Sequence, residues 1–223
     1  MKKYKTKHGY EGLLIVVEGT DGAGKSTQIN MLKRWIEDKS YGAMVSEWKT
    51  SRLISQVIDD AKERNLLNPT TFSLLYAADF ADRLTNSIIP ALEAGFVVLM
   101  DRYKYTAFVR DVVRNHDIEW VKNLYDYAPE PDLVFYLDMP VETLLKRIIG
   151  TTGLDYYESG RDIGLSRDFY KSFKLYQSQC LEEYEKLKQE YNFISIDGTQ
   201  SPEEINQIMR DKIQKLLDTG ILY

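Results

Sequence analysis

The stretch from Val17 to Thr27 constrains the fold of this chain more than any other. It contains the pattern G-x-x-x-x-G-K-S from Gly19 to Ser26. Glycines at both ends let the backbone curl so that its N–H groups point at an anion, while lysine adds positive charge and serine offers a hydroxyl to Mg²⁺. The predicted phosphate-binding residues are Gly19, Asp21, Gly22, Ala23, Gly24, Lys25, Ser26 and Thr27.

The residues on either side of this loop support the prediction. The apolar run from Leu13 to Val17 precedes it and is typical of a buried parallel strand. Apolar residues then recur at helical spacing over residues 26–39, so a bound phosphate would also lie at a helix N-terminus. A glycine-rich turn without a ligand is the alternative interpretation of the bare pattern.

Charge and cysteine content narrow the possible classes of protein. The chain has 29 Lys and Arg against 34 Asp and Glu, a net charge of −5, so no nucleic acid polymer is expected as the main partner. The single Cys180 cannot form an internal disulfide, and no segment resembles a secretion signal or a membrane span. We therefore expect a cytoplasmic protein without a membrane partner, whose basic residues 1–10 form a flexible tail.

The order of apolar and amphipathic segments predicts the fold class. Strands are expected over residues 13–17, 43–48, 96–100, 131–138 and 192–197, and helices lie between them. The longest expected helices cover residues 26–39, 52–67, 104–131 and 166–191. Asn68 with Pro69, and Ser201 with Glu204, predict two further helix starts. Five such alternations predict one α/β domain, residues 1–223, with a doubly wound five-stranded parallel sheet.

A carboxylate and an arginine follow the third expected strand. Asp101 and Arg102 stand at its carboxyl end, the edge of an open parallel sheet where ligands bind. Ser26 and Asp101 are therefore the predicted Mg²⁺ site, because Mg²⁺ prefers oxygen ligands beside phosphates. Arg102 can bind a second phosphate through its two-pronged guanidinium.

The expected lid is the segment over residues 149–165, where regular periodicity lapses. Four glycines stand between residues 150 and 164, which suits a mobile segment that carries cations toward a phosphate. Arg147, just before the segment, and Arg161, within it, are the candidate cations. A structural turn is the alternative role for Arg161.

Together these groups favour phosphoryl transfer between two phosphorylated substrates. The predicted catalytic residues are Lys25 on the donor phosphates, Asp101 on Mg²⁺, Arg102 on the acceptor and Arg161 on the transferring group. An acceptor phosphate monoester has a second pKa of about 6, so it is already anionic at neutral pH and needs no general base. Catalysis then depends on alignment and charge stabilisation.

Two further segments supply candidates for acceptor binding. One helical face can present two of its aromatic rings to a ligand, with a charged pair at one end; core aromatic residues with a surface ion pair are the alternative. The residues of this face are Phe72, Leu75, Tyr76, Asp79, Phe80 and Arg83. The helix after Arg102 begins with polar residues that can line a pocket: Thr106, Arg110 and Asp111.

The chain resembles the thymidylate kinase family of nucleoside-monophosphate kinases. The resemblance spans most of the chain and rests on these segments: residues 19–27 with Asp21 at the third position, 74–79, 101–106, 131–138 and 196–200. It implies a P-loop NTPase fold with a small lid, ATP as donor, dTMP as acceptor, Mg²⁺ as cofactor, and a homodimer. It assigns Asp21 to the acceptor's sugar and matches Lys49 loosely to a loop arginine. Some members of the family carry an arginine at the position of Gly22, and this chain resembles the members whose catalytic arginine lies in the lid instead, which favours Arg161.

The resemblance leaves the acceptor's base open. The family stacks thymine on an aromatic residue, here Tyr76, and contacts its carbonyl with an arginine four residues on, where this chain has Phe80. Arg110 and Asp111 replace the usual aromatic and glutamine or threonine. Arg83 or Arg110 could restore the lost donor, or the pair Arg110 and Asp111 could select another base.

Three hypotheses follow for the function. The first is an ATP-dependent dTMP kinase, and the second is a phosphotransferase of the same fold acting on a different nucleotide or small phosphate. The third is a non-catalytic nucleotide-binding regulator. The Asn-Lys-x-Asp signature of regulatory GTPases is absent from the sequence, and the charged groups needed for transfer are present.

Overall fold

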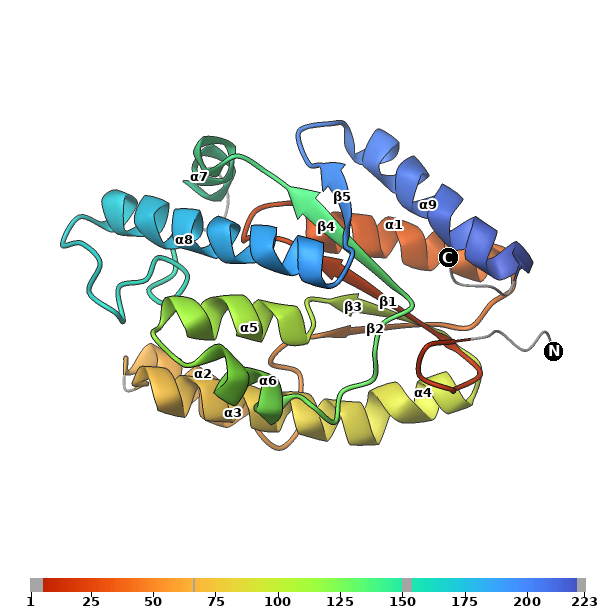
Figure 1. The fold of residues 1–223 in the computed structure, drawn as a ribbon, viewed down its shortest axis with the longest axis horizontal. Helices are drawn as coiled ribbons and strands as arrows, with labels where there is room; N and C mark the ends of the chain where they lie inside the picture. Colours follow the sequence, from red (N-terminus) through yellow and green to blue (C-terminus); the bar gives the residue numbers. More distant parts are fainter. Residues whose placement is uncertain (1–5, 66, 150–153, 220–223) are drawn as a thin grey trace.

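The computed structural model describes residues 6–65, 67–149 and 154–219. Five parallel strands form one sheet in the order β2-β3-β1-β4-β5 (Figure 1). Their bounds are β1 (Leu13–Glu18), β2 (Ala43–Glu47), β3 (Val97–Asp101), β4 (Leu133–Asp138) and β5 (Ile194–Asp197). The predicted α/β class and the five-stranded parallel sheet are confirmed.

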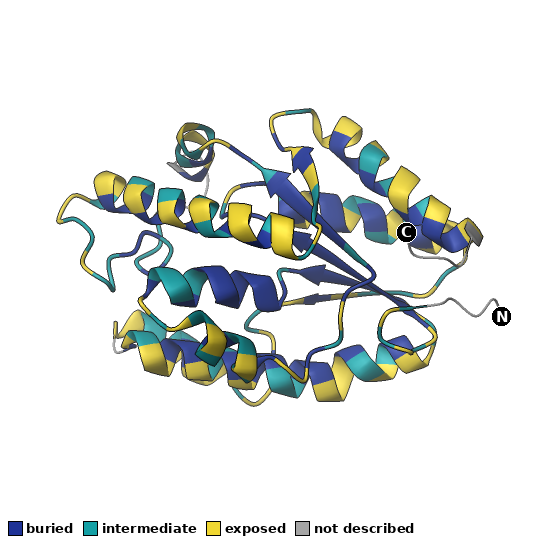
Figure 2. Ribbon diagram, in the orientation of Figure 1, coloured by how far each residue is buried: buried dark blue, intermediate teal, exposed yellow. Residues whose placement is uncertain are grey.

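Helices cover both faces of the sheet, because successive side chains of a strand point to opposite faces. Leu13, Ile15 and Val17 pack on one face with helices α1 (Lys25–Asp38), α7 (Val141–Ile149) and α9 (Pro202–Thr219). Leu14 and Val16 face α3 (Pro69–Arg83), α4 (Ile89–Glu93), α5 (Lys104–Val113), α6 (Ile118–Leu124) and α8 (Phe169–Glu190). The three central strands, β3, β1 and β4, are therefore buried between two helical layers, whereas the edge strands β2 and β5 are partly exposed (Figure 2).

Both predicted helix starts are confirmed. The Asn68 side chain accepts a hydrogen bond from the Thr71 backbone N–H at 2.8 Å, directly before Pro69 in α3. Before α9, the Glu204 N–H donates to Ser201 Oγ at 3.3 Å and the Ser201 N–H donates back to Glu204 at 3.0 Å. Local sequence therefore determines where these two helices begin.

Two helices are shorter than the sequence predicted. The single helix expected over residues 104–131 is divided into α5 and α6, because Asn115 adopts a left-handed φ of 66° and Asp117 caps a new helix start. The helix expected over residues 52–67 is α2, and it covers only Ser55–Glu63. In contrast, α3 continues through a short π-helical stretch, Leu84–Ile88, into α4.

The described part of the N-terminal segment packs against the body, whereas the sequence predicted a flexible tail. His8 Nε2 lies 3.0 Å from Asp132 Oδ2, and both side chains are buried. The same carboxylate accepts a bond from the Leu14 N–H at 2.8 Å, so it joins this segment to the start of β1. Residues 1–5 lie outside the described residues.

Candidate active site

The phosphate-binding loop connects β1 to α1. Gly19, Gly22 and Gly24 have φ values of 146°, 80° and 96°, a region that glycine enters without steric cost. The loop ends at the N-terminus of α1, where backbone N–H groups and the helix dipole favour an anion. Lys25 is buried, and its Nζ donates to the Thr20 carbonyl at 2.8 Å. Burial, reinforced by the nearby charge of Arg102, lowers the pKa of Lys25 to about 8.

Ser26 and Asp101 provide oxygen ligands suited to Mg²⁺. Ser26 Oγ donates to Asp101 Oδ2 at 2.7 Å, because β1 and β3 pair in register and end together. In the described part of the chain, no group of three or more His, Cys, Asp or Glu side chains is arranged to hold a metal. A hydroxyl and a carboxylate nevertheless fit Mg²⁺, since this ion commonly takes one or two protein ligands and completes its shell with phosphates and water.

Glu18 connects the phosphate-binding loop to the turn after β3. Its carboxylate is fully buried and accepts bonds from the Tyr103 N–H at 2.8 Å, Thr106 Oγ1 at 2.7 Å and the Tyr184 hydroxyl at 2.9 Å. Burial raises the pKa of Glu18. The sequence analysis did not single out this residue, although a carboxylate at the end of an apolar strand was the available signal.

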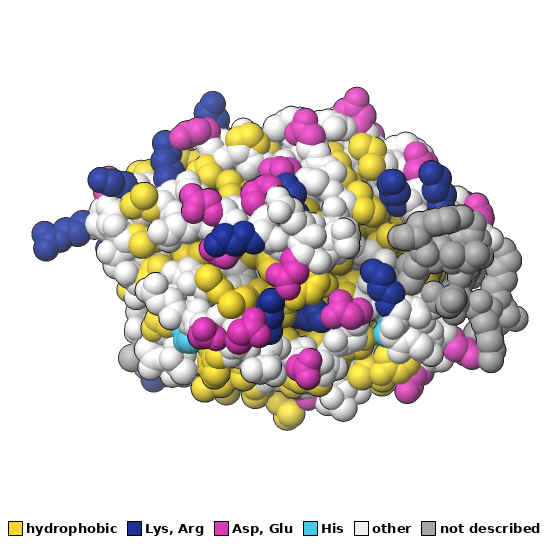
Figure 3. Space-filling view, in the orientation of Figure 1, with side chains coloured by type: hydrophobic (Ala, Val, Ile, Leu, Met, Phe, Trp, Pro, Cys, Tyr) yellow, Lys and Arg dark blue, Asp and Glu magenta, His cyan; other side chains and the backbone are white. Residues whose placement is uncertain are grey.

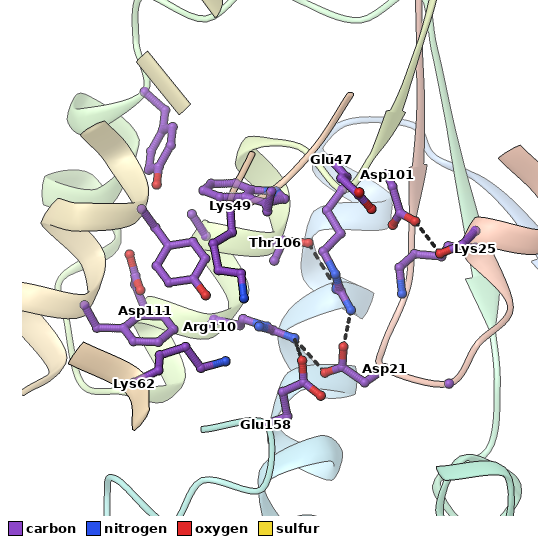
Figure 4. A pocket seen from close by; sticks show the side chains of 18 residues that line it. Asp21, Lys25, Glu47, Lys49, Lys62, Asp101, Thr106, Arg110, Asp111 and Glu158 are labelled. Carbon is purple, nitrogen blue, oxygen red and sulfur yellow. Dashed lines mark hydrogen bonds and ion pairs between the residues drawn. The ribbon is translucent and has the colours of Figure 1, made fainter. Parts of the chain in front are cut away.

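Asp21 is held between two arginines where the loop faces α5 (Figure 4). Arg102 donates to one carboxylate oxygen of Asp21, and Arg110 Nη2 donates to the other at 2.6 Å. Burial alone would raise the pKa of Asp21, but the charges on Arg102 and Arg110 outweigh burial and hold that pKa well below its ordinary range. Arg102 also donates to the Gly19 carbonyl at 3.0 Å, from a backbone with a strained φ of 70°.

A cavity of about 340 Å³ extends from the phosphate-binding loop into a compartment between α3 and α5. We call its two parts the phosphate end, lined by Asp21, Lys25, Ser26, Asp101 and Arg102, and the aromatic end, lined by Trp48, Phe72, Tyr76, Asp111 and Tyr125. In the aromatic end, the rings of Phe72 and Tyr76 stack with centroids 4.5 Å apart. Aromatic walls with a few polar groups suit a planar ligand such as a base.

Several predicted acceptor-binding residues line this cavity, and two do not. Tyr76, Thr106, Arg110 and Asp111 line it, as does Lys49, whose Nζ pairs with Asp59 at 2.5 Å. Phe80 and Arg83 are absent from the lining. Phe80 is fully buried against Tyr103 and Tyr125.

Arg83 belongs to a buried pair that shapes the loop after β2. Its Nε donates to Asp79 at 2.9 Å and its Nη1 donates to Ser46 Oγ at 2.9 Å. Asp79 in turn accepts bonds from the backbone N–H groups of Lys49 and Ser51, at 3.0 and 2.9 Å. The pair therefore lies in the interior rather than at the surface, and it supports the wall of the cavity instead of lining it.

Of the two candidate arginines in and beside the lid segment, only one lies over the phosphate-binding loop. Arg161 Nη1 donates to the carbonyls of Ser166 and Arg167, at 2.7 and 2.6 Å, and does not line the cavity. Arg147, at the end of α7, donates to the carbonyls of Gly22 and Gly198 at 3.5 and 3.4 Å, so it lies over the phosphate-binding loop. Part of the predicted lid, residues 150–153, lies outside the described residues.

The described part of the lid segment consists of turns joined to the body by ion pairs. Three of its acidic side chains lie near cations: Asp155 is 3.4 Å from Lys62, Glu158 is 4.0 Å from Arg110, and Asp162 is 2.7 Å from Arg114. Lys62 and Glu158 also line the cavity, as do Trp48 and Tyr125. The sequence analysis did not propose these four as site residues, because they come from separate elements and no spacing links them.

On the face shown in Figure 3, basic and acidic side chains are interspersed. The phosphate end of the cavity likewise combines both signs, because Lys25 and Arg102 lie there with Asp21 and Asp101. None of the described helices combines the length and the apolar character that a bilayer span requires.

A parallel sheet that carries this loop, with an aspartate-arginine turn beside it, defines a P-loop phosphotransferase of the nucleoside-monophosphate kinase type. The family model described as thymidylate kinase matches residues 17–209. A probable thymidylate kinase 2 of Saccharolobus solfataricus is 42% identical over 94% of this chain and 99% of its own length. A probable thymidylate kinase of Thermococcus gammatolerans is 34% identical over 95% and 98%. The chain therefore belongs to the thymidylate kinase family.

Proposed function

We propose that this protein transfers the γ-phosphoryl group of ATP to dTMP, yielding dTDP and ADP. The observation that carries the proposal is the position of Asp21, which Arg102 and Arg110 hold where the phosphate-binding loop meets the aromatic end of the cavity. Two arginines beside this loop can bring an acceptor phosphate close to the donor phosphate, which is the main requirement for this reaction. Membership of the family supports dTMP as the acceptor.

The phosphate end binds the donor. The loop amides and Lys25 hold the β and γ phosphates, and Arg147 lies over the same loop. Ser26 and Asp101 would hold Mg²⁺, which supplies positive charge against the phosphate oxygens when it is bound. Arg161 can reach the transferring group only after its two bonds to carbonyl oxygens break.

Two arginines, Asp21 and Tyr76 orient the acceptor. Arg102 and Arg110 bind its phosphate, and Asp21 then becomes available to the sugar, because the phosphate competes with this carboxylate for the two guanidinium groups. Tyr76 stacks against the base. The acceptor oxygen is anionic at neutral pH, so these residues only align it and stabilise charge.

Three finer features complete the proposal. Residues 1–223 form one domain. Within this domain, residues 149–165 act as a lid. The enzyme works in the cytoplasm as a homodimer.

Three exposed apolar side chains on and beside α2 and α3 support dimerisation, with exposed fractions of 71% for Leu53, 50% for Val57 and 48% for Leu74. Analytical sedimentation, which measures the molecular mass in solution, tests the homodimer. Wild type should sediment as a dimer, and Val57→Asp should sediment as a monomer, because it places a charge in this apolar surface.

One assay separates the three functional hypotheses. The purified protein is given ATP and Mg²⁺ with each nucleoside monophosphate in turn, and the diphosphate formed is measured. Highest kcat/KM with dTMP supports the proposal, whereas highest kcat/KM with another monophosphate favours a related phosphotransferase. No diphosphate from any acceptor, despite measurable ATP binding, would favour the non-catalytic regulator.

A further inference from the structure

Arg102 has a backbone conformation that an arginine rarely adopts. Its φ of 70° lies in the left-handed region, which costs free energy unless the surrounding structure enforces it. The N–H groups on either side of its Cα are both held by the end of β1. The Arg102 N–H donates to the Val17 carbonyl at 3.1 Å. The next N–H along the chain, that of Tyr103, donates to the Glu18 carboxylate at 2.8 Å. Two consecutive residues of β1 therefore fix the turn that carries Arg102.

Glu18 also caps the helix that follows this turn. Helix α5 begins at Lys104, and its N-cap residue, Tyr103, makes no capping bond with its own side chain. Glu18 Oε1 accepts the N–H groups of Tyr103 and Thr106 instead, at 2.8 and 3.3 Å. These are the two donors that a capping box satisfies, and a carboxylate beside them also interacts favourably with the helix dipole. Glu18 therefore serves as the cap of α5 from 85 residues earlier in the sequence.

The second carboxylate oxygen of Glu18 extends the network to the Arg102 side chain. Glu18 Oε2 accepts bonds from Thr106 Oγ1 at 2.7 Å and from the Tyr184 hydroxyl at 2.9 Å. Thr106 Oγ1 in turn accepts a long bond from Arg102 Nη1 at 3.4 Å (Figure 4). Because the Thr106 hydroxyl proton points to Glu18, a lone pair of Thr106 can face the guanidinium. Glu18 is thus linked to both the backbone and the side chain of Arg102.

The two outer members of this network lie away from the substrate cavity. Glu18 is fully buried, Tyr184 is buried, and neither lines the cavity of about 340 Å³. Burying a carboxylate costs free energy even when it is well hydrogen-bonded, so stability alone is a poor explanation for Glu18. Its bonds converge on one turn, and that turn carries the arginine assigned to the acceptor.

We propose that Glu18 and Tyr184 are positioning residues for phosphoryl transfer, which hold the turn after β3 in the conformation that directs Arg102 at the acceptor's phosphate. Neither side chain touches a substrate, and both act through Arg102. This inference rests on the proposed function, since it requires Arg102 to bind the acceptor. It also explains why a carboxylate stands at the end of β1, because both of its oxygens accept bonds whereas an amide accepts through one.

Glu18→Gln is the first test, because the amide has nearly the same shape as the carboxylate. Its oxygen can keep the two backbone bonds, but its NH₂ group faces the Thr106 and Tyr184 hydroxyls, which lose their shared acceptor. We expect KM for the acceptor to rise roughly tenfold, while KM for ATP stays within about twofold of wild type. Glu18 directly precedes the phosphate-binding loop, so a general loosening of this loop would raise both KM values and would overturn the assignment.

Tyr184→Phe and Tyr136→Phe form a matched pair. Both side chains are buried, and their rings pack with centroids 4.9 Å apart. The Tyr184 hydroxyl donates to Glu18, whereas the Tyr136 hydroxyl has no partner among the described residues. We expect Tyr184→Phe to raise KM for the acceptor about fivefold and Tyr136→Phe to change it less than about twofold. Equal effects of the two variants would overturn the role of Tyr184.

A double-mutant cycle with Arg102→Ala decides whether Glu18 acts through this arginine. Glu18→Gln should lower kcat/KM for the acceptor roughly tenfold in the wild-type background, but less than about twofold in Arg102→Ala, where the residue that it positions is already gone. A loss of roughly tenfold in both backgrounds would overturn the proposal, because it would show a role independent of Arg102. Circular dichroism checks that each variant is folded, and calorimetric Kd values for the acceptor give the same comparison without turnover.

The choice of acceptor for this cycle lets the positioning role and the proposed function fail separately. The cycle is measured with whichever monophosphate wild type uses best. A preference for a monophosphate other than dTMP would overturn the proposed function alone, and the cycle would still decide the role of Glu18. A preference for dTMP with independent losses in the cycle would overturn the positioning role alone. Absence of transfer to every monophosphate would overturn both, since Arg102 would have no acceptor to orient.

Discussion

The two ends of the cavity differ in how their polar groups are satisfied. At the phosphate end, Lys25, Ser26 and Asp21 each already have a partner within the protein. At the aromatic end, the Trp48 and Tyr125 donors have none among the described residues. The phosphate end is therefore organised before substrate binds, whereas these two donors of the aromatic end lie buried behind the cavity surface, unpaired in the described part of the chain. We infer that catalysis depends on the first end and choice of base on the second.

Removing a charge from the phosphate end should have the largest effect. Lys25→Ala is expected to lower kcat about 1000-fold for every acceptor, because the loop loses its positive charge on the donor phosphates. The chain should stay folded, since replacing a buried cation by alanine removes a desolvation cost. Lys33→Ala, an exposed lysine on the same helix that pairs with Glu37, is the matched control. Steady-state rates and circular dichroism test both variants.

The pH dependence should also arise at the phosphate end. Burial holds the pKa of Lys25 at about 8 in the free enzyme, so this cation loses its proton as pH rises past that value. We expect kcat/KM for ATP to fall about tenfold per pH unit above 8. In Lys25→Arg, whose guanidinium stays charged, the residual kcat/KM should show no such decline. A decline at the same pH in both proteins would assign it to another group.

The lid arginines test how far the phosphate end extends. Arg147→Ala should raise KM for ATP and lower kcat/KM about tenfold, because Arg147 lies over the phosphate-binding loop. Arg161→Ala should change these constants less unless the lid moves, since its guanidinium is bonded to Ser166 and Arg167. A larger loss in Arg161→Ala would show that it contacts the phosphates during turnover.

The smallest effect on specificity is expected from the buried pair behind the aromatic end. Asp79→Asn removes the carboxylate that pairs with Arg83, and should lower the free energy of unfolding by about 3 kcal/mol. The preference for dTMP over dCMP should stay within twofold, because neither residue lines the cavity. Urea unfolding and the two kcat/KM values measure these quantities. A changed preference would show that the pair contributes to recognition of the base.

The sequence alone determined the fold class, the phosphate-binding loop and the metal ligands proposed here. The loop residues are contiguous from Gly19 to Ser26, and their conformation depends on glycine and on the adjoining strand and helix. Asp101 could be placed beside Ser26 because parallel strands end at one edge of the sheet. Such features follow from local chemistry and a simple topological rule.

Only the tertiary structure decided the composition of the aromatic end and the positions of the two lid arginines. Trp48, Asp111 and Tyr125 are far apart in the chain and meet because β2, α5 and α6 pack around one compartment. Phe80 and Arg83 have the helical spacing of the residues that line it, yet they turn into the core, and periodicity does not distinguish these two environments. Contacts between distant segments depend on packing, which the spacing of residues within one segment does not encode.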